Sequence, residues 1–155
     1  MINSNKNLIK NDNLDDSDDF IQEYCKNKYN ALLDNLIKEY SDEDDMFNHI
    51  EKDNTNIFVH FYSPKFQKCT ALNCVLSQIV QEDKYPYIQF TKINANKCHV
   101  STKTMEITML PCVAIFKNGY FIEKLIGFEK FGNRETIKKS DVEKYLNQSE
   151  LTKTW

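Results

Sequence analysis

The chain has 155 residues, of which 41% are hydrophobic and 12% aromatic, and its formal net charge is −3. This length and apolar content suit one domain with room for an added arm. The negative charge argues against nonspecific nucleic-acid binding, which needs a basic face, and no apolar run approaches the roughly 20 residues that cross a bilayer. Residues 1–10 lack the apolar stretch of a secretory leader, so we expect a cytoplasmic protein.

Residues 1–19 consist mostly of Asn, Lys, Asp and Ser and end in Asp15-Asp16-Ser17-Asp18-Asp19. A segment of this composition cannot bury enough apolar surface to offset the entropy of ordering. We therefore predict a disordered acidic arm, which is either a solvated leader or a docking tail for a partner.

Residues 20–54 form the predicted N-terminal helical region. Apolar residues recur at steps of three and four between Phe20 and Tyr40, which predicts one long amphipathic helix. The residues of this face are Ile21, Cys25, Tyr29, Leu32, Leu36 and Tyr40. The face can pack on its own domain or contact a partner or a second copy, and the sequence leaves dimerisation open. The acidic run Ser41–Asp45 ends the helix and can cap a shorter one that reaches Ile50.

From residue 55 to 155 the pattern changes to strands that alternate with helices. The expected strands are Ile57–Tyr62, Ile88–Asn94, Cys112–Lys117 and Phe121–Gly127, and the expected helices are Lys68–Gln81, His99–Glu106 and Val142–Gln148, the last capped by Ser140. The first two strands are separated by a helix and should be parallel, whereas Asn118-Gly119 predicts an antiparallel hairpin. A mixed α/β sheet with helices on both faces follows.

The five cysteines of the chain have no disulfide-scaffold or zinc-site spacing. They are Cys25, Cys69, Cys74, Cys98 and Cys112, and no Cys-x-x-Cys occurs. The three histidines are also scattered along the sequence. We expect mostly free thiols, no metal site and no cofactor.

Two segments resemble the thioredoxin family. Residues 61–69, Phe-Tyr-Ser-Pro-Lys-Phe-Gln-Lys-Cys, match thioredoxin's Phe-Trp-Ala-Glu-Trp-Cys-Gly-Pro-Cys, with Phe66 in place of the first cysteine and Cys69 in place of the second. Residues 110–119, Leu-Pro-Cys-Val-Ala-Ile-Phe-Lys-Asn-Gly, match its Ile-Pro-Thr-Leu-Leu-Leu-Phe-Lys-Asn-Gly. The resemblance implies a thioredoxin-like fold in which the Leu110–Pro111 bond is cis and its loop lies against the broken motif.

The chain also departs from thioredoxin at positions that matter chemically. His60 replaces the buried acid, and we interpret it as a neutral, hydrogen-bonded core residue, with a proton shuttle as the alternative. Cys69 should be shielded one turn into its helix, although the helix N-terminus and Lys68 could lower its pKa. Cys112, after the proline, is the better candidate partner for a disulfide, but both cysteines are more simply interpreted as buried structural thiols.

Among thioredoxin-like proteins that lack the first cysteine, the chain resembles the phosducin-like family, and more narrowly its phosducin-like protein 3 branch. The matching segments are His60-Phe61-Tyr62, Phe66 with Cys69, Gly127-Phe128, Phe131-Gly132-Asn133, Asp141–Leu146 and Ser149-Glu150-Leu151. This resemblance implies a non-catalytic co-chaperone that binds the cytosolic chaperonin and modulates the folding of tubulin or actin. The alternative is a weak monothiol redox protein, a thioredoxin-like disulfide reductase of low activity that uses Cys69.

Overall fold

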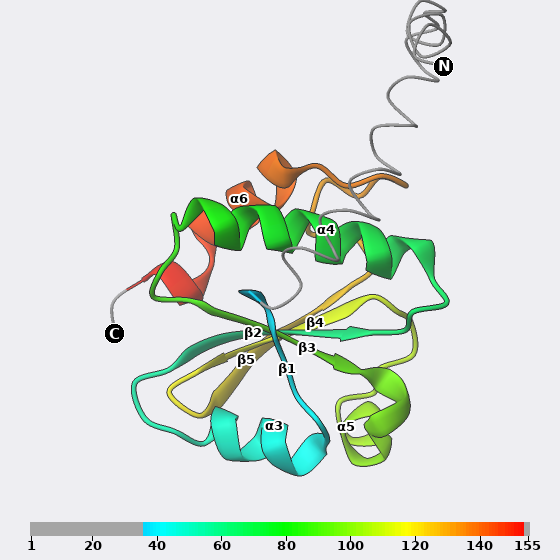
Figure 1. Cartoon of the computed structure of the whole chain (residues 1–155), viewed down its shortest axis with the longest axis vertical. Helices are drawn as coiled ribbons and strands as arrows, with labels where there is room; N and C mark the ends of the chain where they lie inside the picture. Colours follow the sequence, from blue (N-terminus) through cyan, green and yellow to red (C-terminus); the bar gives the residue numbers. More distant parts are fainter. Residues whose placement is uncertain (1–35, 154–155) are drawn as a thin grey trace, which may run out of the picture.

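The structure, a computed structural model, describes residues 36–153 and contains a five-stranded sheet in the order β1-β3-β2-β4-β5 (Figure 1). The strands are β1 (Lys38–Glu39), β2 (Asn56–Tyr62), β3 (Gln89–Asn94), β4 (Cys112–Lys117) and β5 (Tyr120–Ile126). The helices are α3 (Glu43–Ile50), α4 (Gln67–Glu82), α5 (His99–Thr104) and α6 (Lys139–Gln148), with short 3₁₀ turns η2 (Ala95–Lys97) and η3 (Glu150–Thr152). The predicted thioredoxin-like mixed fold is confirmed.

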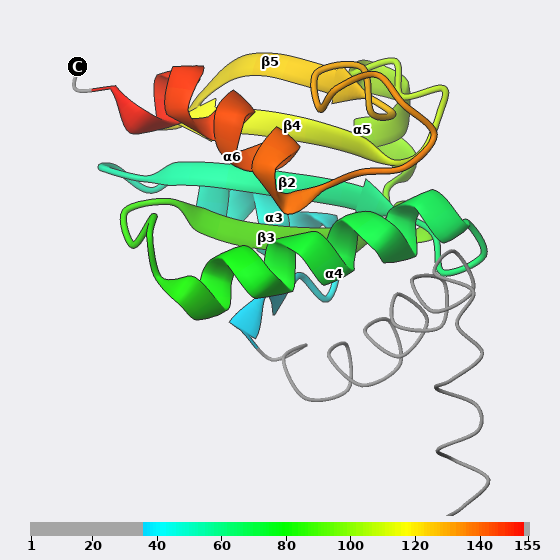
Figure 2. The same ribbon diagram turned by 90° about the horizontal axis from the view of Figure 1, so that it is seen from above.

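Strand β2 lies at the centre of the sheet. It pairs in parallel with β3, where Val59 opposes Thr91, and antiparallel with β4, where Val59 opposes Ala114. The predicted parallel pairing of β2 with β3 is confirmed, and so is the predicted hairpin, because β4 pairs antiparallel with β5 on either side of Asn118-Gly119. The interior of β2 is completely buried because helices cover both faces of the sheet (Figure 2).

Each face of the sheet has its own hydrophobic core. Helices α4 and α6 cover one face, and α3 and α5 cover the other. The first core contains Phe58, Leu72, Val75, Leu76, Ile79, Val113, Ile115, Leu125, Val142 and Leu146. The second contains Tyr40, Met46, Ile50, Ile57, Val59, Phe61, Ile93, Cys98, Cys112, Ala114 and Phe116. Successive residues of β2 and β4 alternate between the two cores, as the period of a strand requires.

The end of the predicted Phe20–Tyr40 helix is wrong. Residues 38 and 39 form the edge strand β1, parallel to β3, and the N–H of Tyr40 donates to the carbonyl of Lys92 at 3.0 Å. Ile37 and Tyr40 are buried three residues apart, a spacing that also fits a helix, so periodicity could not distinguish the two. Residues 38–50, which we expected in a separate helical region, therefore belong to the layers of this domain. The acidic arm and residues 20–35 lie outside the described residues.

Helix α3 is capped by Asp42, and its own residue Glu43 caps the start of helix α5. The Asp42 carboxylate accepts the N–H of Asp45 at 2.8 Å and begins α3, as the acidic run predicted. Glu43 accepts the N–H of Val100 at 3.2 Å and both the N–H and the hydroxyl of Ser101 at 2.6 Å. Burial alone would raise the pKa of Glu43, but these hydrogen bonds outweigh it and place the pKa below its usual value.

Helix α6 begins earlier than the sequence predicted. Its first residue is Lys139, so Ser140 lies inside the helix and the predicted Ser140 cap is wrong. The Asp141 carboxylate instead reaches back to accept the N–H of Lys138 at 3.1 Å. Asp141 therefore satisfies a backbone group that the start of a helix leaves without a partner.

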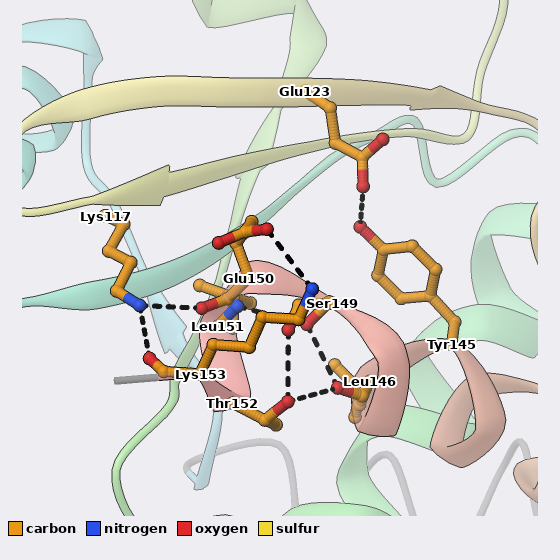
Figure 3. A network of polar contacts seen from close by, with 9 residues as sticks. All are labelled: Lys117, Glu123, Tyr145, Leu146, Ser149, Glu150, Leu151, Thr152 and Lys153. Carbon is orange, nitrogen blue, oxygen red and sulfur yellow. Dashed lines mark hydrogen bonds and ion pairs between the residues drawn. The ribbon is translucent and has the colours of Figure 1, made fainter. Parts of the chain in front are cut away.

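The C-terminal turn η3 is held to β4 by a buried lysine (Figure 3). Lys117 is only 4% exposed, and its ammonium donates to the carbonyls of Glu150, at 2.8 Å, and of Lys153. Ser149 caps the same turn by accepting the N–H of Leu151 at 3.2 Å. A cation thus adds a charged donor to two carbonyls at the C-terminal end of the turn, where positive charge is favourable.

We expect Lys117→Met to lower the free energy of unfolding by about 1–3 kcal/mol, because it keeps the aliphatic stem but leaves two carbonyls without their charged donor. Urea unfolding monitored by circular dichroism measures the change. Lys52→Met, at an exposed lysine, is the matched control. Equal stability of the two variants would contradict the anchoring role of Lys117.

Candidate functional site

The candidate site lies at one end of the sheet, where three connections converge. Strands β2 and β3 both end there because they are parallel, and β4 begins there because it is antiparallel to β2. The loop into α4, the turn η2 and the loop before Pro111 therefore meet at this edge. Topology alone brings together residues that are about 45 positions apart in the sequence.

Phe66 occupies the N-cap position of α4 and is exposed. Its backbone is extended, its side chain makes no capping hydrogen bond, and 48% of the residue is accessible to solvent. The N–H of Phe66 donates to the carbonyl of Ser63 at 3.2 Å, which fixes the turn into the helix. The position where thioredoxin has its attacking cysteine thus presents an apolar ring to solvent.

A shallow groove of about 450 Å³ begins at Phe66. Its floor and walls come from the turn after β3, from α5 and from the loop before β4. The lining residues are Phe66, Ala95, Thr102, Ile107, Thr108, Met109 and Leu110. Met109 is 56% exposed, so this end of the molecule presents two large, accessible apolar side chains at one groove.

The predicted cis peptide between Leu110 and Pro111 is confirmed. The carbonyl of Pro111 accepts the N–H of Gly127 at 2.8 Å, and Gly127 has φ +57°, a conformation that favours glycine. A Cβ on Gly127 would also contact the sulfur of Met109 at 3.7 Å. Gly127, part of a Gly127-Phe128 match singled out in the sequence without a role, therefore supports the proline loop.

Cys69 is completely buried in the first turn of α4. Burial raises the pKa of its thiol, and a backbone hydrogen bond at Ser63 opposes this only in part. The Lys68 ammonium lies 5.2 Å from the centre of the Phe128 ring and 3.5 Å from a Glu135 carboxylate oxygen. The prediction that the helix N-terminus and Lys68 lower the pKa of Cys69 is therefore wrong, because desolvation dominates.

Cys112 does not complete a redox pair with Cys69. Its side chain belongs to the core under α3 and α5, whereas Cys69 belongs to α4 on the opposite face of the sheet. Burial raises the pKa of Cys112 to about 11, and both cysteines are free. The geometry matches the simpler interpretation, in which each is a buried structural thiol.

His60 links the centre of the sheet to α4. It is fully buried, and its Nδ1 lies 2.8 Å from the side-chain oxygen of Asn73, so we assign the ring proton to Nδ1. Burial lowers the pKa of His60 to about 4, the nearby charge of Lys92 adds to this, and Asn73 partly opposes it. Nε2 meets no hydrogen-bond partner in the part of the chain that the structure describes. The imidazole is neutral at physiological pH, as a core histidine would be.

Asn73 was missed in the sequence, although a signal for it exists. It follows Cys69 by four positions, so the two share one face of α4. A buried histidine on the preceding strand needs a partner of this kind. The combination of His60 with a polar residue facing the sheet could have identified the contact.

Within residues 36–153, no three His, Cys, Asp or Glu side chains gather as metal ligands would. No helix in that range is both long and apolar enough to cross a membrane. The described site therefore combines an exposed aromatic ring, an apolar groove, a buried thiol and a neutral histidine.

The thioredoxin family model matches residues 37–140 of the chain. Phosducin-like protein 3 from Dictyostelium discoideum is 34% identical over 83 residues, which cover 54% of this chain and 44% of that protein. Human thioredoxin domain-containing protein 9 is 25% identical over 114 residues, which cover 74% of this chain and 49% of that protein. The chain thus spans about half the length of the curated relatives it matches.

Solved thioredoxins share the fold of this chain. Oxidised mitochondrial thioredoxin 3 from Saccharomyces cerevisiae superposes with a TM-score of 0.57 at 21% identity, covering 73% of this chain and 95% of that one. At this identity the likeness concerns the fold alone.

The buried His60 should make stability depend on pH. Its pKa is about 4 in the folded chain and 6.5 when exposed, so the unfolded chain binds an extra proton between these values. As the pH falls from 6.5 towards 4, this group removes about 1.4 kcal/mol of stability per pH unit. We expect His60→Gln to reduce the slope of unfolding free energy against pH, measured by urea titration between pH 7 and 5. Equal slopes in the wild type and in His60→Gln would refute the assignment.

The buried Cys69 should react slowly in the folded protein, because reagents attack the accessible thiolate. We expect alkylation of Cys69 by iodoacetamide at pH 7.5, followed by peptide mass spectrometry, to be at least about tenfold slower than in urea. Insulin reduction should also be the same for the wild type and Cys69→Ser. Rapid labelling in the native state, or loss of insulin reduction on substitution, would instead favour redox chemistry.

Proposed function

The chain belongs to the thioredoxin family and, within it, to the phosducin-like group, and on this premise we propose that it is a cytoplasmic co-chaperone without catalytic turnover. It binds the cytosolic chaperonin and modulates the folding of tubulin or actin. The observation that carries the proposal is the exposed Phe66, which stands beside an apolar groove at the position of the thioredoxin nucleophile.

The chemistry of the site favours binding over disulfide exchange. Exchange needs one thiolate to attack a disulfide and a second thiol to release the mixed disulfide. Cys69 is buried with a raised pKa, and Cys112 faces the other side of the sheet. This site therefore has neither an accessible thiolate to attack a disulfide nor a second thiol to release the mixed disulfide.

The groove has properties of a protein-binding surface. Aromatic and methionine side chains are enriched in interfaces because they bury large apolar areas and adapt to a partner's shape. Phe66 and Met109 are both about half exposed, and the proline loop that carries Met109 is fixed by the Gly127 hydrogen bond. A rigid base with accessible apolar anchors suits a hot spot of binding.

A monothiol redox function through Cys69 is the alternative. It would need the first turn of α4 to open, because the thiol has no access to solvent in the folded chain. The alkylation and insulin measurements above decide between this alternative and the binding role.

We expect Phe66→Ser combined with Met109→Ser to weaken binding to purified chaperonin by roughly 30-fold or more, since truncation of interface anchors costs about 1–2 kcal/mol each. Surface plasmon resonance with the full chain measures the change. Tyr120→Ser is the matched control, because Tyr120 is 68% exposed but begins β5 at the opposite end of the sheet.

Two outcomes would contradict the proposal at different levels. If the wild type does not bind the chaperonin at moderate salt, the co-chaperone function is wrong. If the wild type binds and the double variant binds equally well, the groove is not the contact surface, and another part of the chain carries the interaction.

A further inference from the structure

Cys74 in α4 is disulfide-bonded, which sets it apart from the other cysteines that the structure describes. Cys69, Cys98 and Cys112 are free thiols, as the sequence led us to expect. The chain contains five cysteines, and the one that remains is Cys25, which precedes the described residues. Elimination therefore leaves Cys25 as the candidate partner of Cys74.

Cys74 lies on the face of α4 that points away from the sheet. Successive helical residues are about 100° apart, so Cys74 stands about 200° around α4 from Leu72, which belongs to the core between α4 and the sheet. Ser77 stands about 140° from Leu72. Yet Cys74 is only 7% exposed and Ser77 only 1%. Because one sheet cannot cover opposite sides of a helix, other protein atoms cover this outer face.

Helix α6 meets a different flank of α4 (Figure 2). Lys139 of α6 pairs with Glu82, which stands about 280° from Leu72 and therefore about 80° from Cys74. The α4 residues from 69 to 81 also contain no charged side chain, although 28% of the chain is charged. A helix without a charged face is buried on all sides. Both observations indicate that a further segment packs on the outer face of α4.

We propose that Cys25 and Cys74 form a reversible, redox-sensitive disulfide that links the N-terminal region of the chain to the outer face of α4. The link closes the chain between residues 25 and 74, a stretch that includes β1, α3 and β2. A cross-link of this kind stabilises a protein mainly by restricting its unfolded chain. Reduction of the link therefore lowers the stability of the domain without changing any residue of the Phe66 groove.

Glutathione is the reductant whose chemistry fits this disulfide. The thiolate of one glutathione attacks a sulfur of the link, so that the bond between Cys25 and Cys74 breaks as a mixed disulfide forms. The released cysteine takes up the proton that glutathione lost. A second glutathione attacks the mixed disulfide in the same way. The protein gains two thiols, and the two glutathione molecules become one glutathione disulfide; oxidation is the reverse.

The reversibility of the link rests on the cytoplasmic location in the proposed function. Glutathione keeps most cytosolic thiols reduced, and the disulfides that occur there are mainly catalytic or redox-sensing. Cys74 is buried, and Gln78, one turn along α4, donates to its sulfur at 3.8 Å. A buried sulfur is unsuited to catalytic turnover, which leaves redox sensing as the role of the link.

Thiol trapping in the full chain tests the link directly and needs no chaperonin, so its failure would leave the co-chaperone function standing. The chain is equilibrated with several ratios of reduced to oxidised glutathione, alkylated with N-ethylmaleimide in urea and digested without reductant. We expect a peptide that joins Cys25 to Cys74 in oxidising mixtures, and an at least fivefold smaller fraction of it at about the cytosolic ratio. Cys69, Cys98 and Cys112 should be alkylated at every ratio.

Stability supplies the second measurement, with Cys25→Ser as the matched variant, because it removes the link and leaves α4 unchanged. Dithiothreitol should lower the urea midpoint of the wild type to that of Cys25→Ser and should leave the midpoint of the variant where it was. The proposal would be overturned by a linked peptide that joins other cysteines or two chains, by a link that persists in excess reduced glutathione, or by an equal effect of dithiothreitol on both proteins.

Discussion

The buried ladder of β2 is the constraint on which the rest of the structure depends. A central strand with a parallel neighbour on one side and an antiparallel neighbour on the other forces two strand ends and one strand start to the same edge. The loop to α4, the turn after β3 and the Pro111 loop have no other place to lie. The loop residues at this end of the sheet can be substituted while the β2 strand pairing, which is buried on both faces, stays intact.

The departures from thioredoxin form one physical arrangement. Phe66 removes the nucleophile and adds an exposed ring, while His60 replaces a charged acid with a neutral group paired to Asn73. The neutral imidazole of His60 does not provide the ionised carboxylate that could exchange a proton with Cys69. The desolvated thiol is then left with a raised pKa.

Most of the fold was predictable because local patterns and global packing agree. The helices and strands after residue 55 follow from periodicity, and the cis bond at Pro111 follows from the family resemblance. The edge strand β1 was not predictable, since two exposed residues between Ile37 and Tyr40 fit either element and only pairing with β3 decides it. The predicted Ser140 cap of α6 is wrong because Asp141, one residue later, accepts the N–H at the start of the helix. The groove at Met109 was not predicted, because its lining residues come from segments that are distant in the sequence.

The Glu43 carboxylate of α3 affects the Phe66 groove indirectly, through helix α5. Helix α5 has only six residues, too few to persist alone, and its first N–H groups depend on an acid from α3. Because Thr102 of α5 lines the groove, a disturbance of α3 would reach the groove through local opening of α5, without unfolding the sheet. The wall of the groove that Thr102 forms therefore depends on hydrogen bonds that Glu43 makes from another helix.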